Sequence, residues 1–106
     1  MKIKALAGSF REKSYNKLTL KYMVQGAKEA GADVETIDLR DYLMPAFDED
    51  IEKQGAPENT LKLKEKLREA KGILICTPEY NHSIPGGFKN VIDWVSRGKD
   101  QPFRGK

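Results

Sequence analysis

The sequence is poor in the residues that build disulfides and metal centres, and it has no long apolar run. Its 106 residues include one cysteine, Cys76, and one histidine, His82. A single cysteine cannot form an intramolecular disulfide, which fits a reducing cytoplasm, and one histidine without a cysteine cluster predicts no metal site. No apolar run approaches the roughly 20 residues that span a membrane, and the N-terminus does not have the pattern of a signal peptide. We therefore expect a cytoplasmic protein that does not enter a membrane.

Charge of neither sign dominates the chain. The formal net charge is +3, with 33% charged and 39% hydrophobic residues. The lysines are interleaved with glutamates along the expected helices, which is typical of a solvated face rather than of a nucleic-acid surface. The length suits one small domain with a single core. The composition thus favours a globular domain that does not bind nucleic acid.

The apolar pattern predicts strands and helices in alternation. Short apolar runs predict strands at residues 2–7, 33–39 and 72–77. Apolar residues at helical spacing predict helices at residues 15–30, 57–70 and 87–96. Such alternation predicts an α/β fold with a parallel sheet, right-handed crossovers and helices on both faces. We expect the first strand to be central and the second to lie nearer an edge.

Some of these elements have more specific expectations. The first helix should bury one stripe made of Leu20, Met23, Val24 and Ala27, and Gly31 should end that helix in a left-handed conformation. The second strand should alternate, with Val34 and Ile37 as its apolar members. The third apolar run should be a buried strand in which Cys76 packs, the alternative being a reactive thiol. Residues 40–59 should form a long loop, either functional or an excursion over the surface.

A polar loop follows the first strand. Ser9 and Ser14 supply hydroxyl donors, Arg11 supplies a planar charged donor, and Asn16 can donate its amide or cap the helix. A helix N-terminus presents unpaired N–H groups and the positive end of the helix dipole, so this loop suits a phosphate. With only Gly8 for backbone freedom, it is neither a dinucleotide G-x-G-x-x-G nor a Walker P-loop. The alternative is an ordinary helix start with Ser14 or Asn16 as N-cap.

A second polar loop follows the third strand, at residues 77–87. It offers a carboxylate, an aromatic ring, an amide and a hydroxyl on Glu79, Tyr80, Asn81 and Ser83. In open α/β sheets, ligands bind at the carboxyl ends of the strands. This loop therefore predicts a site for a flat polar ligand.

Together the two loops match a known pattern. Gly-Ser-x-Arg-x-x-Ser-x-Asn stands at residues 8–16, and Pro-Glu-Tyr-Asn-x-Ser-x-Pro-Gly-x-x-Lys-Asn-x-x-Asp-Trp stands at residues 78–94. In both motifs the chain resembles the NAD(P)H-dependent FMN reductase family, flavodoxin-like proteins that include quinone, azo-dye and chromate reductases. The second motif is the longer and more specific one. The similarity runs over the whole chain, including Leu43-Met44-Pro45 and the acidic residues 48–50.

The resemblance implies a flavodoxin-like three-layer α/β/α domain with FMN at the carboxyl ends of the strands. By position in the motifs, the FMN phosphate would be held by Ser9, Arg11, Ser14 and Asn16. The ribityl chain and the isoalloxazine ring would be lined by Pro78, Glu79, Tyr80, Asn81, His82 and Ser83. In this family hydride passes from NAD(P)H to the flavin and then to a small-molecule acceptor: free flavin, a quinone, an azo compound or a metal oxyanion. The protein orients and tunes the flavin, so no catalytic side chain is expected.

Several motif residues have a structural alternative. Tyr80 could be an exposed turn aromatic, and Glu79 could serve a neighbouring subunit or cap a helix. Three polar residues of the last helix are expected to be structural or interfacial rather than catalytic: Lys89, Asn90 and Asp93. Trp94 is expected in the core or at a subunit interface, and the resemblance implies a homodimer or homotetramer.

The chain is short for the family it resembles, whose members are near twice as long and have a five-stranded sheet. We expect residues 1–106 to form a single, C-terminally truncated domain with strands in the order 2-1-3, strands four and five being missing. An exposed edge on the third strand would invite pairing with another chain. The chain could be a fragment of a reductase, a half-domain completed by oligomerisation, or a short product that binds flavin weakly.

The expected function is FMN-dependent NAD(P)H oxidoreductase. The alternatives are an FMN-binding or oligomer-forming fragment without turnover, and an interaction module without ligand.

Overall fold

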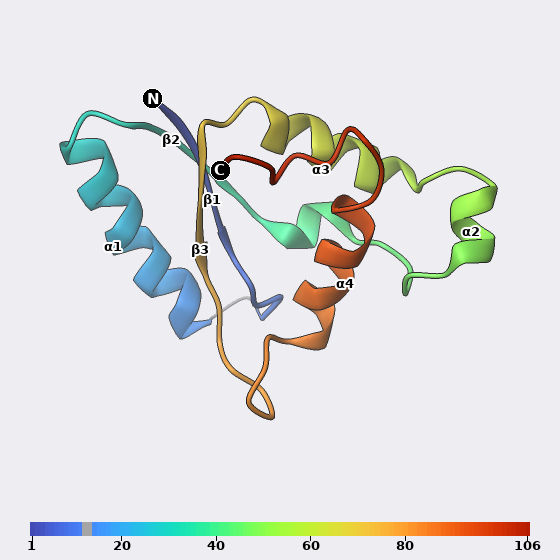
Figure 1. Ribbon diagram of the computed structural model, residues 1–106. Coiled ribbons are helices and arrows are strands. Elements are labelled where there is room, and N and C mark those ends of the chain that lie inside the picture. Colours follow the sequence, from blue (N-terminus) through green and yellow to red (C-terminus); the bar gives the residue numbers. More distant parts are fainter. Residues whose placement is uncertain (12–13) are drawn as a thin grey trace.

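Strands and helices alternate along the chain in the computed structural model, which describes residues 1–11 and 14–106 (Figure 1). Glu12 and Lys13, in the predicted first loop, lie outside the described residues. The elements, in chain order, are β1 (Lys2–Ala7), α1 (Tyr15–Glu29), β2 (Asp33–Ile37), the 3-10 helix η1 (Leu39–Tyr42), α2 (Glu49–Lys53), α3 (Glu58–Arg68), β3 (Gly72–Cys76) and α4 (Gly86–Val95).

The described strands form one parallel sheet in the order β2-β1-β3, as the sequence predicts. In the register of the sheet, Ile3 of β1 lies opposite Val34 of β2 and Gly72 of β3. Helix α1 covers one face, and α3 and α4 cover the other (Figure 1). The fold is therefore flavodoxin-like, with three layers and the first strand in the centre.

Each face of the sheet has its own apolar cluster because successive side chains of a strand point to opposite faces. Leu6 of β1 belongs to the cluster under α3 and α4, which includes Leu63 and Phe88. Its neighbour Ala5 belongs to the cluster under α1, which includes Leu20. Ala7, the other alanine of β1, packs in the same cluster under α1.

The second strand buries both of its predicted apolar members. Val34 packs in the cluster under α1 and Ile37 in the cluster under α3 and α4, because residues three apart in a strand point to opposite faces. The strand ends at Ile37 rather than at Leu39. The side chain of Asp38 accepts a hydrogen bond from the N–H of Arg40 and caps η1, which turns the chain out of the sheet.

Helix α1 confirms most of its predicted stripe. Leu20 and Val24 are buried and Ala27 packs against them, but Met23 lies at the margin of the stripe and is 38% exposed. The helix is capped at its end as predicted. Gly31 has a φ of 95°, and its N–H donates to the carbonyl of Lys28.

The third strand is less buried than its apolar sequence predicts. Ile75 is 42% exposed, and the other residues of β3 are of intermediate burial. Within the described residues β3 pairs with β1 on one side only, which leaves its other edge open. Cys76, half-buried against the cluster under α1, packs as the sequence favours.

The long segment between β2 and α3 is not one loop, because it contains η1 and the short helix α2. Helix α4 holds its central part in place. The indole N–H of Trp94 and the amide of Asn90 both donate to the carbonyl of Pro45, at 2.8 and 2.9 Å, and Asn90 also accepts from the N–H of Phe47 at 2.7 Å. Trp94 is 1% exposed, which confirms its expected place in the core.

Over the described residues, no helix is both long and apolar enough to cross a membrane.

Candidate functional site

The two predicted ligand loops lie together at the carboxyl end of the sheet, at the lower edge of the ribbon in Figure 1. The N–H of Gly8, directly after β1, donates to the carbonyl of Cys76, the last residue of β3, at 2.8 Å. A Cβ atom on Gly8 would lie 2.4 Å from Oγ1 of Thr77 and 2.8 Å from the ring of Phe88. Only glycine permits this approach, so the first loop is seated directly against the start of the second.

A second contact joins the first loop to the start of α4. The ring of Phe10 lies over Gly87, where an added Cβ would be 2.9 Å from a ring carbon. Sequence reasoning missed Phe10, Thr77 and Gly87 as the residues that join the loops. The contact of Thr77 could have been inferred, because the ends of two neighbouring parallel strands lie a short distance apart. Nothing in the motif indicated the contact of Phe10.

The first loop presents two buried hydroxyls. Ser9 and Ser14 are 6% and 8% exposed. Their oxygens accept the N–H groups of Arg11 and Asn16, at 3.3 and 3.1 Å, so Ser14 is the N-cap of α1. A hydroxyl that accepts through its oxygen still has its hydrogen to donate. Capping and phosphate binding are therefore compatible at Ser14, and both side chains suit a phosphate group.

Asn16 and two arginines complete this side of the site. Oδ1 of Asn16 lies 3.5 Å from the thiol of Cys76, which ties the first turn of α1 to the end of β3. Arg11 is exposed, so its guanidinium is accessible to an anion. Arg40, which sequence reasoning missed, donates from Nη1 to the carbonyl of Phe10 at 3.4 Å. Arg40 lies 30 residues further along the chain in the predicted long loop, where no motif marks it.

The second loop is a tight hairpin. Tyr80 and Ser83 exchange two backbone hydrogen bonds of 2.7 and 3.0 Å. Asn81 and His82, between them, have φ values of 51° and 63°, the two positive angles of a type I′ turn. Nδ1 of His82 lies 3.3 Å from Oε1 of Glu79. The hairpin displays its side chains to solvent, since Glu79 to Ser83 are all exposed and Pro78 is half-buried.

The structure thus brings the two predicted groups of residues to one edge of the sheet. One group surrounds the N-terminus of α1 with buried hydroxyl donors and arginines. The other carries an exposed aromatic ring, Tyr80, on a hairpin with fixed geometry. Among residues 1–11 and 14–106, no three histidine, cysteine or acidic side chains gather as metal ligands would. The arrangement can hold an anionic group at the helix and a flat polar group beside the hairpin.

A parallel 2-1-3 sheet with helices on both faces defines a flavodoxin-like protein, with the two polar loops at the carboxyl edge of its sheet. The comparison with known proteins is more specific. The model of the NADPH-dependent FMN reductase family matches residues 1–106, and the chain belongs to this family.

Named relatives agree with this membership. The chain is 39% identical to a quinone reductase of Escherichia coli and 38% identical to an NAD(P)H-dependent FMN reductase of Pseudomonas aeruginosa; each match covers 100% of the chain and 56% of the relative. Among solved structures, the flavoenzyme NAD(P)H:(acceptor) oxidoreductase FerB of Paracoccus denitrificans is similar with a TM-score of 0.77 and 33% identity, over 95% of this chain and 53% of that one. The chain therefore spans about half the length of the relatives it matches.

Proposed function

We propose that the chain binds FMN and carries the FMN site of an NAD(P)H-dependent oxidoreductase. The proposed overall reaction is NAD(P)H plus H⁺ plus a quinone giving NAD(P)⁺ and a quinol, with FMN relaying the two electrons. The observation that carries the proposal is the junction of the two loops at Gly8 and Thr77, where the start of the first loop packs against the start of the second. The names of the quinone reductase relatives support the acceptor class.

The chain's own residues would bind and orient the cofactor. Ser9 and Ser14 would donate their hydroxyl hydrogens to the phosphate, together with Asn16 and the guanidinium of Arg11. The hairpin residues Pro78, Glu79, Tyr80, Asn81, His82 and Ser83 would flank the ribityl chain and the ring. When bound, FMN supplies the two-electron chemistry, and the protein supplies position and electrostatics. No side chain of the described part is needed as a nucleophile.

Binding can be measured without turnover. FMN fluorescence titrations should show quenching and saturation with the unaltered protein. Loss of a buried, charge-assisted hydrogen bond costs about 1.5–3 kcal/mol, so Ser9→Ala should weaken FMN binding by about 10- to 100-fold. Arg11→Ala should weaken it less, because this side chain is exposed.

Two variants serve as matched controls. Ser96 is an exposed serine that ends α4, and Arg68 is an exposed arginine paired with Glu65 on α3. Ser96→Ala and Arg68→Ala should leave FMN affinity unchanged. A protein that does not quench FMN fluorescence at any concentration, or a Ser9→Ala variant that binds as tightly as the unaltered chain, would contradict the proposal.

A second candidate function is an FMN-binding module without turnover. It is favoured by the share of the relatives that the chain spans, 56% of each of the two described above. NAD(P)H oxidation in the presence of a quinone separates the two functions. Bound FMN together with quinone-dependent NAD(P)H oxidation supports the reductase, and bound FMN without it supports the module.

A further inference from the structure

A groove runs between α1 and the edge strand β2, and its end at Ala7 and Lys17 adjoins the first predicted flavin loop in the chain. It encloses about 380 Å³, which lies within the range of sites for small organic ligands. Its floor is apolar, formed in part by Ala7, Leu20 and Val24. It includes none of the residues proposed to hold FMN, so it is independent of the proposed function.

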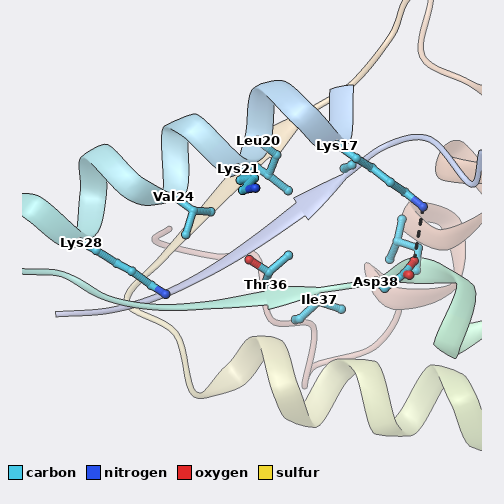
Figure 2. A pocket seen from close by; sticks show the side chains of 10 residues that line it. Lys17, Leu20, Lys21, Val24, Lys28, Thr36, Ile37 and Asp38 are labelled. Carbon is cyan, nitrogen blue, oxygen red and sulfur yellow. Dashed lines mark ion pairs between the residues drawn. The ribbon is translucent and has the colours of Figure 1, made fainter. Parts of the chain in front are cut away.

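Three lysines and one hydroxyl rim this groove. Lys17, Lys21 and Lys28 project from α1, and Thr36 faces them from β2. Figure 2 shows Lys17 and Lys28 at opposite ends of the groove, both directed toward β2, with Thr36 between them. The combination is an apolar trough with positive charge along one side.

The lysines of the groove differ from the cations of α3 in their pairing. All four cations of α3 lie within 4 Å of a carboxylate, in the pairs Lys62–Glu58, Lys64–Asp100, Lys66–Glu35 and Arg68–Glu65. In the groove, Lys17 lies 3.8 Å from Asp38. Over residues 1–11 and 14–106, Lys21 and Lys28 form no ion pair. Asp38 thus partly neutralises Lys17, whereas no carboxylate of the described part of the protein neutralises Lys21 and Lys28.

We propose that the α1–β2 groove binds a small amphipathic carboxylate. The apolar body of the ligand would lie in the trough above Leu20 and Val24, against the methylene chains of the flanking lysines, where burial of apolar surface is favourable. Its carboxylate would accept hydrogen bonds from the ammonium groups of Lys21 and Lys28, with the hydroxyl of Thr36 as a further donor. A neutral ligand of the same shape would gain the apolar contact but not the charge pairing.

The probe for this site is 2-naphthoate, with the neutral 2-naphthamide as its isosteric comparison. Both are titrated into the ¹⁵N-labelled protein, with and without saturating FMN, and followed by amide chemical shifts. Naphthoate should shift the amides of Leu20, Val24 and Thr36 in both conditions, and naphthamide should bind about tenfold more weakly. Displacement of naphthoate by FMN, shifts confined to the two flavin loops, or equal affinity for the two probes would overturn the proposal.

Variants then assign the contacts. An exposed ion pair between a lysine and the carboxylate contributes a modest binding free energy. Lys21→Gln and Lys28→Gln should therefore each weaken naphthoate binding about two- to fivefold, and together about tenfold, without altering naphthamide binding. Lys53→Gln makes the same charge change on α2, distant from the groove in Figure 1, and should have no effect. Thr36→Phe should fill the groove and abolish binding of both probes. Unchanged naphthoate affinity in the double lysine variant would contradict the proposed contacts.

Discussion

Gly8 is the residue on which the geometry of the flavin site depends most directly. Its missing side chain allows the first loop to touch both Thr77 and Phe88, one from the second loop and one from the core of α4. The atoms around it belong to short or buried side chains, which cannot swing away as the end of a lysine could. A single added methyl group must therefore displace one of the two loops.

Gly8→Ala should destabilise the protein by about 1–3 kcal/mol, the usual cost of overpacking a well-packed site, and it should also weaken FMN binding. Urea unfolding measures the first effect and fluorescence titration the second. Gly26→Ala is the matched control, because a Cβ on Gly26 meets nothing within 4 Å and alanine favours the interior of α1. This variant should gain about 0.5–1 kcal/mol. Equal stability of the two variants would contradict the close approach at Gly8.

His82 occupies the second position of the type I′ turn, where glycine is most favourable. Its side chain is 98% exposed, so its replacement removes little packing. His82→Gly should increase hydrogen-exchange protection of the amide of Ser83, which donates to Tyr80, by a factor equivalent to about 0.5–1 kcal/mol. His82→Val should lower this protection, because a β-branched residue is strained at positive φ. Glu79→Gln removes the carboxylate that lies 3.3 Å from Nδ1 of His82 without changing the backbone and should have little effect.

At the scale of elements, the sequence correctly predicted the features in which the apolar pattern alone determines which residues are buried. The alternation of strands and helices was enough to predict a parallel sheet with helices on both faces and the first strand in the centre, and the family resemblance supplied the order β2-β1-β3. Sequence reasoning failed where burial depends on a neighbouring strand. The apolar run of β3 predicted a buried strand, but β3 pairs with β1 alone within the described residues and Ile75 is 42% exposed.

The candidate site was predictable to a similar extent. The motifs placed both loops correctly at the carboxyl edge of the sheet, because strand ends are visible in the sequence. The joining contacts were not predictable, because Phe10 against Gly87 and Arg40 against the carbonyl of Phe10 depend on packing between distant segments. The hairpin at Tyr80–Ser83 was also missed, since Asn-His is not a typical pair for a type I′ turn.

The junction of β1, β2 and α3 contains a buried cation that makes stability depend on pH. The ammonium of Lys4, whose side chain is 5% exposed, lies 2.5 Å from Glu35 and 3.2 Å from Glu69. The hydrogen bond from Lys4, followed by one from Lys66, lowers the pKa of Glu35 below its ordinary value of 4.5. The hydrogen bond to Glu35 raises the pKa of Lys4 above 10.5, although burial opposes this shift.

A lowered carboxyl pKa contributes stability that is present above the unfolded value and lost as pH falls through the folded one. Stability should therefore decline as pH falls below 4.5. Glu35→Gln should reduce this decline by about 0.5–1 kcal/mol. The expected change is small because Glu35 is half-exposed and solvent screens its charge. Glu58→Gln, in an exposed pair with Lys62, is the control and should leave the decline unchanged. Urea unfolding at a series of pH values tests this, and an identical pH dependence for Glu35→Gln and the unaltered protein would contradict it.

At the scale of the whole molecule, the two edges of the sheet are unlike. Beside β2 the edge carries charge, including the paired Glu35. Beside β3 it is apolar: Ile75 is 42% exposed and borders an apolar cavity of about 170 Å³ lined also by Phe88, Ile92 and Phe103. An apolar strand edge without a partner among the described residues is a template for pairing with another strand. We expect this edge, rather than β2, to determine how the 106-residue chain associates.

The prediction that follows is self-association of the 106-residue chain through β3, measured by sedimentation velocity over a range of protein concentrations. Ile75→Lys should shift the chain toward the monomer, because a charge on an exposed strand opposes edge pairing. Leu61→Lys makes the same change at a residue of α3 that is 51% exposed, away from the strand edge, and should leave the association unchanged. If Leu61→Lys disrupts the association and Ile75→Lys does not, the contact lies on the helical face instead. A chain that remains monomeric at every concentration would show that the edge of β3 is protected without a partner, in spite of its exposed isoleucine.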